Sequence, residues 1–458
     1  MTRVAIIGGG PGGLMTALLI GRKYGDECRT TLFEASDTLG GKLRTRSFGS
    51  APVPYEAGAA ECYDYSALGH DPLRALVEGL GLTRQRMHGQ TVILDGTVLR
   101  SDEDIGRHWG AATMGAIRDF RRRAAELLPI DRWHPGSWRY DSTHAWSHRT
   151  CDQLLDTVTD PVARKYLSVA AHSDLATEPH LTSGLNGLKN FVMDVPGYVE
   201  FYAIEGGMGA LGRRLAGSIP STDVECNARV VRIERTFDGE WRVRYIRRGH
   251  VDERLFDAVV VALPASQLGA VEYAGDPLRR TMGAHIARFD RPGHYLRVSL
   301  LFRSPFWHDL LSGSWFMIDA FGGACVYDES ARYDAGGYGV LGFLVAGNDA
   351  LAMMNVEQAT VVQHVVDTLP GRLRQQANEL LVESRIHRWC GGVSGLPGGL
   401  PTADPRIAHE PDANRLPGLF VVGDYLFDST LNGVYRSADL ASTLLSAQLT
   451  AETAATAA

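Results

Sequence analysis

The stretch that decides the fold is residues 4–34, VAIIGGGPGGLMTALLIGRKYGDECRTTLFE. A short apolar run, Val4–Ile7, is typical of a parallel strand that is covered on both faces. A glycine-rich turn follows, then an apolar segment of helical spacing at Leu14–Ile20, then a second strand-like run at Thr30–Phe33 that ends in Glu34. This order predicts a β-α-β unit at the amino terminus.

The glycine-rich turn fits the pattern G-x-G-x-x-G at Gly8, Gly10 and Gly13, and Glu34 follows at the distance typical of a dinucleotide-binding fingerprint. Gly8 permits the tight turn, Gly10 lets the backbone approach a pyrophosphate, and Gly13 lets the helix pack closely on the strand. The helix amino terminus then faces the diphosphate, and Glu34 accepts the ribose hydroxyls. We therefore predict a nucleotide site rather than a purely structural glycine turn.

A second match to the same pattern occurs at residues 207–212, with Glu234 at a similar distance. The segment before it, Phe201–Glu205, is a poor candidate for a buried strand. We expect no second dinucleotide site there.

Composition excludes several functional classes. The chain has 458 residues and a formal net charge of −7, so it has no net field that would attract nucleic acid or anionic lipid. Its six cysteines form no C-x-x-C pair, which disfavours a disulfide framework or a zinc site and favours the cytoplasm. No apolar run approaches the ~18 residues of a membrane span. We expect no nucleic-acid partner, no membrane partner and no metal; His144 and His148 have helical spacing but no acidic partner pattern nearby.

Four further segments carry a resemblance to a known family: LGGKLRT at 39–45, YEAGAAE at 55–61, LPGLFVVGDY at 416–425 and DSTLNG at 428–433. With the fingerprint, these occur in the order found in the flavin-containing amine oxidase superfamily, which the chain resembles. That superfamily includes monoamine oxidases, polyamine oxidases and L-amino acid oxidases.

The resemblance implies an α/β fold in which a discontinuous, Rossmann-like FAD-binding domain is interleaved with an α+β substrate-binding domain. Residues 1–78, 201–270 and 388–458 would form the first domain, and 79–200 and 271–387 the second. From the residues themselves, Arg107–Leu128 has a helical pattern.

The resemblance implies FAD as the cofactor and assigns residues to it. Lys42 would lie near the diphosphate, the backbone of Val230 would hold the adenine, and Asp424 would contact the ribityl and phosphate portion. The small residues that pass close to the isoalloxazine would be Gly58, Ala59 and Ala60, and the helix whose amino terminus points at the flavin pyrimidine would open at Thr430 and Leu431.

Attachment of the flavin is expected to be non-covalent. The position of the cysteine that attaches flavin in monoamine oxidases falls on Val393, and Cys390, three residues earlier, is expected to be a packed thiol. The paired tyrosines that sandwich simple amines fall on Ser394 and Thr430, so a small arylalkyl monoamine is a poor candidate substrate.

Two charged positions also depart from the family. Arg297 stands where the family has a lysine that holds a water at flavin N5; the alternative is a surface arginine. Glu61 stands where L-amino acid oxidases have an arginine for the substrate carboxylate. A carboxylate there favours a cationic or hydrogen-bond-donating substrate and could accept a proton; the alternative is a solvated or ion-paired glutamate.

Other candidates for the substrate site are Tyr327, as a wall opposite the flavin, together with Trp389 and Ser394. An aromatic and histidine-rich stretch could form a lid or a pocket rim, although irregular surface structure is the simpler interpretation. Its members are Trp133, His134, Trp138, Tyr140, His144, Trp146 and His148.

We therefore expect an FAD-dependent oxidase or dehydrogenase that takes hydride from a carbon bearing nitrogen and produces an imine. Its substrate would be a specialised small molecule, such as one of secondary metabolism, and O2 would be the acceptor; a homodimer is left open. The alternative is a C–C desaturase or dehydrogenase of the protoporphyrinogen oxidase or phytoene desaturase type. A third class uses FAD structurally or for a non-redox isomerisation.

Overall fold

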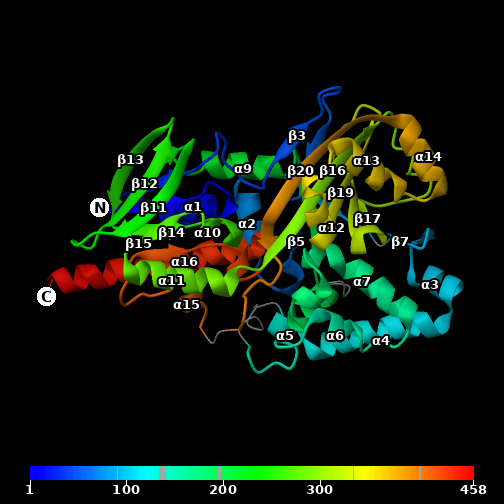
Figure 1. The fold of residues 1–458 in the computed structure, drawn as a ribbon, viewed down its shortest axis with the longest axis horizontal. Coiled ribbons are helices and arrows are strands. Elements are labelled where there is room, and N and C mark those ends of the chain that lie inside the picture. The colour runs from blue at the N-terminus through cyan, green and yellow to red at the C-terminus, as the bar shows by residue number, and fades with distance from the viewer. Residues whose placement is uncertain (90, 134–140, 194–197, 334, 402–403, 458) are drawn as a thin grey trace.

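The computed structural model describes all residues except 90, 134–140, 194–197, 334, 402–403 and 458, and for 448–457 it describes the backbone alone. The architecture is mixed α/β, as predicted. The sheet that contains β14 lies towards the end of the molecule that carries both termini, and the sheet that contains β16 and β19 lies towards the other end (Figure 1).

The first sheet has five parallel strands and begins with the predicted β-α-β unit, which the structure confirms. Its strands, in spatial order, are β10 (Thr222–Glu225), β2 (Cys28–Phe33), β1 (Thr2–Ile7), β14 (Ala258–Val261) and β21 (Leu419–Val421). Three helices cover one face of it: α1 (Pro11–Tyr24), α9 (Met208–Gly217) and α16 (Leu431–Ala457).

The two faces of β1 pack against different layers, because successive side chains of a strand point to opposite sides. Val4 and Ile6 belong to the apolar cluster that includes α1, α9 and α16. Ala5 and Ile7 belong to the cluster formed with the next sheet. All four side chains are buried, which explains why this strand is apolar at every position.

A four-stranded sheet and two helices cover the other face. The sheet is β13 (His250–Phe256), β12 (Trp241–Arg247), β11 (Ala228–Arg235) and β15 (Glu272–Ala274), and the helices are α10 (Ala265–Leu268) and α11 (Asp276–Phe289).

A seven-stranded sheet forms the second part of the molecule. Its strands, in spatial order, are β20 (Leu381–Ser394), β16 (Pro292–Phe302), β19 (Gly339–Ala346), β18 (Ala324–Asp328), β17 (Trp315–Ile318), β7 (Thr91–Leu94) and β8 (Thr97–Leu99). Strand β20 runs unbroken across residue 388, where the sequence places a domain boundary; the domain bounds stay a prediction.

Two small sheets complete the strands: β3 (Thr45–Ser47) with β4 (Pro54–Glu56), and β5 (Cys62–Asp64) with β9 (Glu200–Ile204) and β6 (Arg84–Met87). The remaining helices named here are α2 (Pro72–Gly79), α3 (Asp102–Trp109), α4 (Ala111–Leu127), α5 (Ile130–Trp133), α6 (Cys151–Leu155), α7 (Pro161–Leu175), α8 (Gly184–Met193), α12 (Gly347–Ala352), α13 (Gln358–Asp367), α14 (Gly371–Leu380) and α15 (Pro405–His409).

The helical pattern predicted over Arg107–Leu128 is confirmed, with one break. The segment contains the end of α3 and all of α4, which are separated at Gly110. That residue has φ +91°, a conformation that glycine adopts readily and that ends a helix.

The aromatic stretch is only partly a surface feature. Trp133 and Trp146 are buried in the helical core, which contradicts a rim formed by these two side chains. His144 and His148 each bond to a backbone carbonyl. His134, Trp138 and Tyr140 lie outside the described residues.

The part of the chain that the structure describes offers neither a membrane span nor a metal site. No helix there is long and apolar enough to cross a bilayer. No group of three or more His, Cys, Asp or Glu side chains there is placed to hold a metal ion.

Candidate cofactor and substrate site

One cavity of about 580 Å³ extends from the glycine-rich turn after β1 to the seven-stranded sheet. With one exception it is lined by every residue that the sequence analysis assigns to the site: Gly8, Gly10, Glu34, Lys42, Gly58, Ala59, Ala60, Glu61, Val230, Arg297, Tyr327, Trp389, Ser394, Asp424, Thr430 and Leu431. The exception is Gly13. The tertiary structure therefore brings together residues from both large sheets.

The three glycines of the turn have different surroundings. Gly8 has φ +110°, and a Cβ on it would lie 2.6 Å from the carbonyl oxygen of Ala262. A Cβ on Gly13 would lie 1.9 Å from the carbonyl oxygen of Gly8, so its role is close packing rather than contact with a ligand. Gly10 faces open space: no heavy atom lies within 4 Å of where its Cβ would be.

This end of the cavity fits a dinucleotide such as FAD. Gly10 precedes α1, and no side chain caps that helix, so its amino terminus is available to an anionic diphosphate. The Glu34 carboxylate accepts hydrogen bonds from the backbone N–H of Gly9 and of Ser36, both at 2.8 Å, and so fixes the turn as well as lining the cavity. Val230 lines the same end, next to a β-bulge in β11.

Gly58 and Lys42 contact each other. A Cβ on Gly58 would lie 2.0 Å from the carbonyl oxygen of Lys42, so glycine is required there by the backbone of this chain itself. The same oxygen accepts a hydrogen bond from Ala59 N at 3.0 Å. The ammonium of Lys42 donates to the carbonyl oxygen of Gly392, which ties the turn to β20.

The helix α16 begins where the sequence predicts. Thr430 precedes it, and its Oγ1 accepts a hydrogen bond from Gly433 N at 3.1 Å, a standard capping contact. The Asp424 carboxylate accepts from Ser394 N at 3.0 Å. Because Ser394 Oγ also accepts from Leu396 N at 3.3 Å, this serine serves local backbone contacts at the cavity wall.

Arg297 is buried, which excludes the alternative that it is a surface arginine. Its side chain is 1% exposed and forms an ion pair with Glu329, whose side chain is 0% exposed. Its Nε and Nη2 also donate to the carbonyl oxygen of Glu56 at 3.3 Å. Nη1 has no hydrogen-bond partner among the described residues.

Glu61 lines the cavity. Its Oε2 is buried and has no hydrogen-bond partner in the part of the chain that the structure describes. A hydrogen bond links Glu61 to Tyr327, and burial, followed by the charges of its neighbours, raises the pKa of the Tyr327 phenol well above its usual range. Glu61 is half-buried and forms no ion pair within the described residues, which excludes the ion-paired alternative, whereas its role in the site stays a prediction.

Tyr327 is held between two arginines. The guanidinium carbon of Arg297 lies 4.9 Å from the centre of its ring, and that of Arg332 lies 5.1 Å away. Arg332 also donates to the carbonyl oxygen of Ala60 at 2.7 Å. Arg332 thus fixes the peptide that precedes Glu61, as well as the tyrosine that Glu61 bonds.

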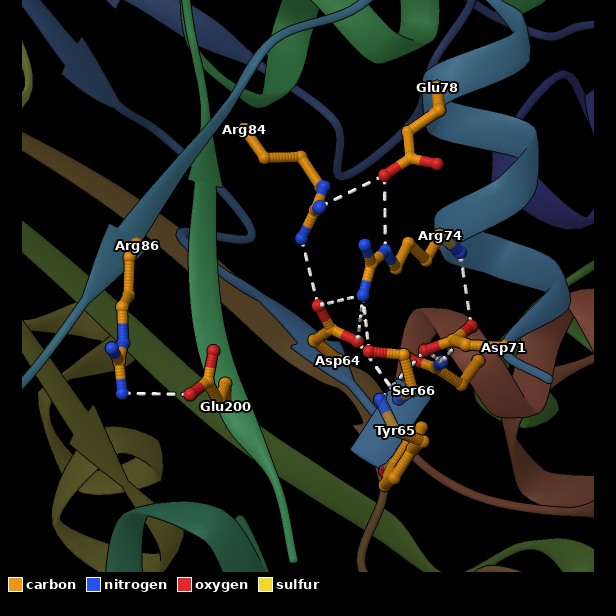
Figure 2. Close-up of polar contacts among 10 residues, drawn as sticks. Asp64, Tyr65, Ser66, Asp71, Arg74, Glu78, Arg84, Arg86 and Glu200 are labelled. Carbon is orange, nitrogen blue, oxygen red and sulfur yellow. Dashed lines mark hydrogen bonds and ion pairs between the residues drawn. The ribbon is translucent and has the colours of Figure 1, made fainter. Parts of the chain in front are cut away.

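A network of charged residues fixes strand β5, which follows Glu61 directly (Figure 2). Asp64 pairs with Arg74 at 3.1 Å and with Arg84 at 2.8 Å. Asp71 caps α2 and accepts a hydrogen bond from Asn432 Nδ2, in the first turn of α16, at 3.3 Å. The segment that carries Glu61 is therefore tied to the start of α16.

Sequence reasoning missed several buried charges around the cavity. Glu56, 1% exposed, accepts from Met208 N at 2.9 Å and from the Tyr333 hydroxyl at 2.7 Å. Burial, followed by the nearby charge of Glu329, raises its pKa to about 7. Glu56 was visible within a quoted motif, but nothing local indicates its partners.

Lys189 was also missed. It lies on the buried helix α8, lines the cavity and pairs with Asp428 at 3.2 Å. Lysine is rarely buried unless it is paired, so its place as the one charged residue of this helix was the available signal.

The second glycine pattern is not a dinucleotide site, as expected. It opens α9, but the segment before it, β9, lies in a small antiparallel sheet. The first N–H groups of α9 are already bonded: Met208 N to Glu56, and Gly209 N to Thr45 Oγ1 at 2.9 Å. Glu234 forms ion pairs with Arg232 and Arg242, outside the cavity.

The prediction for Cys390 is wrong. It was expected to be a packed thiol, yet it is exposed and lines the cavity, as does Val393. Strand β20 lies at the edge of the seven-stranded sheet, and the alternation of its side chains leaves that of Cys390 exposed.

Comparison with known proteins assigns the chain to a family. The sequence pattern of the family described as flavin containing amine oxidoreductase matches residues 11–446. The chain belongs to this family. The cofactor of this flavin-containing amine oxidoreductase is therefore FAD, for which the cavity provides the glycine turn, Glu34 and the open start of α1.

The curated relatives of this family member include the coproporphyrinogen III oxidases of Mycobacterium tuberculosis and Mycobacterium bovis. Each is 29% identical over 298 residues, which cover 57% of this chain and 59% of the relative. The match therefore spans less than two thirds of those proteins.

Among solved structures, a redesigned putrescine oxidase is similar with a TM-score of 0.75 and 18% identity, over 98% of this chain and 99% of the other. The cyclohexylamine oxidase of Brevibacterium oxydans is similar with a TM-score of 0.73 and 17% identity, over the same shares. At these identities the likeness shows a shared fold.

Proposed function

We propose that this flavin-containing amine oxidoreductase oxidises a substrate at a carbon that bears nitrogen and gives an imine. The observation that carries the proposal is that one cavity contains both the dinucleotide turn and Glu61, an acid with a buried oxygen that has no partner among the described residues. Because Glu61 is only half-buried and lines the cavity, its carboxylate can accept a hydrogen bond from a ligand there. An N–H of an amine is a suitable donor.

The residues that line the cavity would have separate roles in this reaction. FAD supplies the two-electron oxidant when it is bound. Glu61 binds the substrate N–H and accepts the proton that nitrogen loses as the C=N bond forms. Tyr327 and Trp389 form walls that orient the carbon, and Trp389 is itself fixed by a hydrogen bond from Nε1 to the carbonyl oxygen of Ala57 at 2.7 Å.

Arg297 is proposed as a fixed cation at the cavity wall. It differs from lysine because it cannot act as a neutral amine, so a proton relay through it is not part of the proposal. Its pairing with Glu329 supports this, since the pair holds the guanidinium in one orientation.

The proposal also names an electron acceptor and a class of substrate. O2 would reoxidise the flavin and form hydrogen peroxide, and the substrate would be a specialised metabolite. The cytoplasmic location, the non-covalent attachment of FAD and the homodimer stay predictions.

An anaerobic screen of amines, amino amides and amino acids tests the function, with flavin absorbance as the readout. We expect at least one amine to bleach the flavin within seconds, and air to restore the absorbance with peroxide release. A flavin that no C–N substrate reduces would contradict the proposal.

The alternative is oxidation at a C–C bond. The 29% identity to coproporphyrinogen III oxidases supports it weakly, and coproporphyrinogen III is added to the same anaerobic assay to test it. Porphyrin fluorescence that appears only with enzyme, together with bleaching of the flavin, would favour this second candidate.

A further inference from the structure

The segment 56–61 is held by side chains that reach it from other parts of the chain. Its last four residues line the cavity. Arg297 donates to the carbonyl oxygen of the first residue, Glu56, at 3.3 Å, and Trp389 donates to that of the second, Ala57, at 2.7 Å. Both donors belong to residues that line the cavity themselves.

Arg332 is a third donor to this segment, and it differs from the other two because it does not line the cavity. Its Nη1 donates to the carbonyl oxygen of Ala60 at 2.7 Å. Its guanidinium also lies over the ring of Tyr327, with 5.1 Å between the guanidinium carbon and the ring centre. Both contacts lead to Glu61, because Ala60 precedes it in the chain and Tyr327 is hydrogen-bonded to it.

The charge of Arg332 is poorly compensated for a buried group. Of its three side-chain nitrogens, only Nη1 has a hydrogen-bond partner within the described residues, and that partner is the neutral carbonyl oxygen of Ala60. An apolar side chain of similar volume often stabilises a protein as well as a buried charge does. Filling this space therefore needs no arginine, whereas holding the Ala60 carbonyl needs a donor.

We infer that Arg332 is a positioning residue for Glu61, which it fixes in the wall of the cavity, and that it affects the reaction only through that acid. The inference rests on the proposed function, in which Glu61 accepts the proton from the substrate nitrogen. Proton transfer depends steeply on distance and direction, so a small displacement of Glu61 slows the reaction even when every reacting group is present.

Two substitutions separate the donor from the bulk of the side chain. Arg332→Met keeps an unbranched side chain but removes the donor and the charge, whereas Arg332→Lys keeps a charge and a donor. The matched control is Arg303→Met, at an exposed position. Thermal unfolding and flavin absorbance verify that each variant is folded and holds FAD; Arg332→Lys carries the comparison if Arg332→Met does not fold.

A double-mutant cycle with Glu61→Gln measures whether Arg332 acts through Glu61. The readout is the rate of flavin reduction in anaerobic stopped flow, with the substrate that the screen identifies. Arg332→Met alone should lower this rate on the order of 10-fold to 100-fold, and Arg332→Lys should lower it less.

In the Glu61→Gln background the same Arg332→Met substitution should change the rate by less than about twofold, because no base is left to position. A role in folding alone would not produce this dependence on Glu61. Equal effects of Arg332→Met in the two backgrounds would overturn the inference.

Hydrogen–deuterium exchange of the holoenzyme tests the contact without any substrate. The backbone amides of a peptide that covers residues 56–61 should exchange at least about threefold faster in Arg332→Met than in the wild type, because the segment loses a fixed point. Arg303→Met should leave this exchange unchanged. Exchange that is unchanged in Arg332→Met as well would overturn the inference.

The outcomes separate the two proposals. If an amine reduces the flavin, Glu61→Gln slows the reduction and the effects of the two substitutions are additive, the inference fails and the proposed function stands. If only coproporphyrinogen III reduces the flavin, the proposed function fails, and the same cycle with that compound decides the inference. Full activity of Glu61→Gln would overturn the inference whichever substrate is oxidised.

Discussion

Arg297 and Glu329 form an ion pair in the interior, between strand β16 and the residue that follows β18. Gly342 on the neighbouring strand β19 makes room for it, because a Cβ there would lie 2.3 Å from Glu329 Oε1. A pair of charges this deeply buried is stable only while both partners are present. The pair therefore connects the stability of the protein to the geometry of the cavity.

Removing one member of this pair should destabilise the protein strongly. We expect Arg297→Met to lower the free energy of unfolding by about 3–5 kcal/mol, because Glu329 is left as an uncompensated buried charge. Arg297→Met with Glu329→Gln should recover part of the loss. Urea unfolding measures both, and Arg279→Met on the surface is the control. A loss below about 1 kcal/mol for Arg297→Met would show that the pair is not maintained in solution.

The carboxylate of Glu34 should strengthen the binding of FAD. Glu34→Ala removes the acceptor that holds Gly9 N and that faces the cavity, and charged hydrogen bonds contribute about 1.5–3 kcal/mol each. We expect Kd for FAD to rise by roughly 10-fold to 100-fold, measured by reconstituting the apoprotein. Glu234→Ala, at the acid of the second glycine pattern, is the control. An unchanged Kd for Glu34→Ala would mean that the ribose is held elsewhere.

Attachment of the flavin can be determined directly. Acid precipitation should release all FAD into the supernatant, because Val393 cannot form a thioether. Cys390 is the only cysteine exposed in the described structure and it lines the cavity, so Cys390→Ser is the informative comparison. Flavin that stays with the wild-type pellet but leaves that of Cys390→Ser would contradict non-covalent binding.

Glu61→Gln tests the acid at the substrate end of the cavity. The substitution keeps the shape of the side chain but removes its charge and basicity, so kcat/KM should fall by roughly 10²-fold to 10⁴-fold. FAD content should not change. Glu253→Gln, on the surface sheet, is the control. A smaller loss confined to KM would assign Glu61 to binding alone, and full activity would remove it from the site.

Glu56 should make stability depend on pH. Its pKa is raised to about 7 in the folded protein from a usual value near 4.5, so the folded state binds this proton more tightly than the unfolded state. Between these two values the unfolded chain loses this proton while the folded protein keeps it, so a rise in pH lowers the stability, by on the order of 3 kcal/mol in total.

The comparison that isolates this effect is with Glu56→Gln. Buried histidines act in the opposite direction: burial lowers the pKa of His285 to about 3 and of His409 to about 4, so they cost stability as pH falls below 6.5. The difference in unfolding free energy between the variant and the wild type cancels the histidines. That difference should grow in favour of Glu56→Gln from pH 5 to pH 7.5, and a constant difference would refute the raised pKa.

Features encoded over a few neighbouring residues could be predicted from the sequence. The β-α-β unit, the roles of Gly8 and Gly13 and the start of α16 after Thr430 depend on short-range periodicity, on turn geometry and on capping. These are properties of adjacent residues, so they are visible without the fold. The family resemblance then predicted most of the remaining residues that line the cavity.

Partners supplied by distant segments were decided only by the tertiary structure. The sequence placed Arg297 on a strand but could not reveal Glu329 across the sheet, and it treated Gly58 as room for a cofactor when the nearest atom is the carbonyl oxygen of Lys42. The reason is physical: burial and charge pairing depend on which surfaces meet in three dimensions, whereas propensity depends on the local chain. Whether an arginine is a solvated surface group or a fixed buried cation is therefore determined by packing, and not by its neighbours in the sequence.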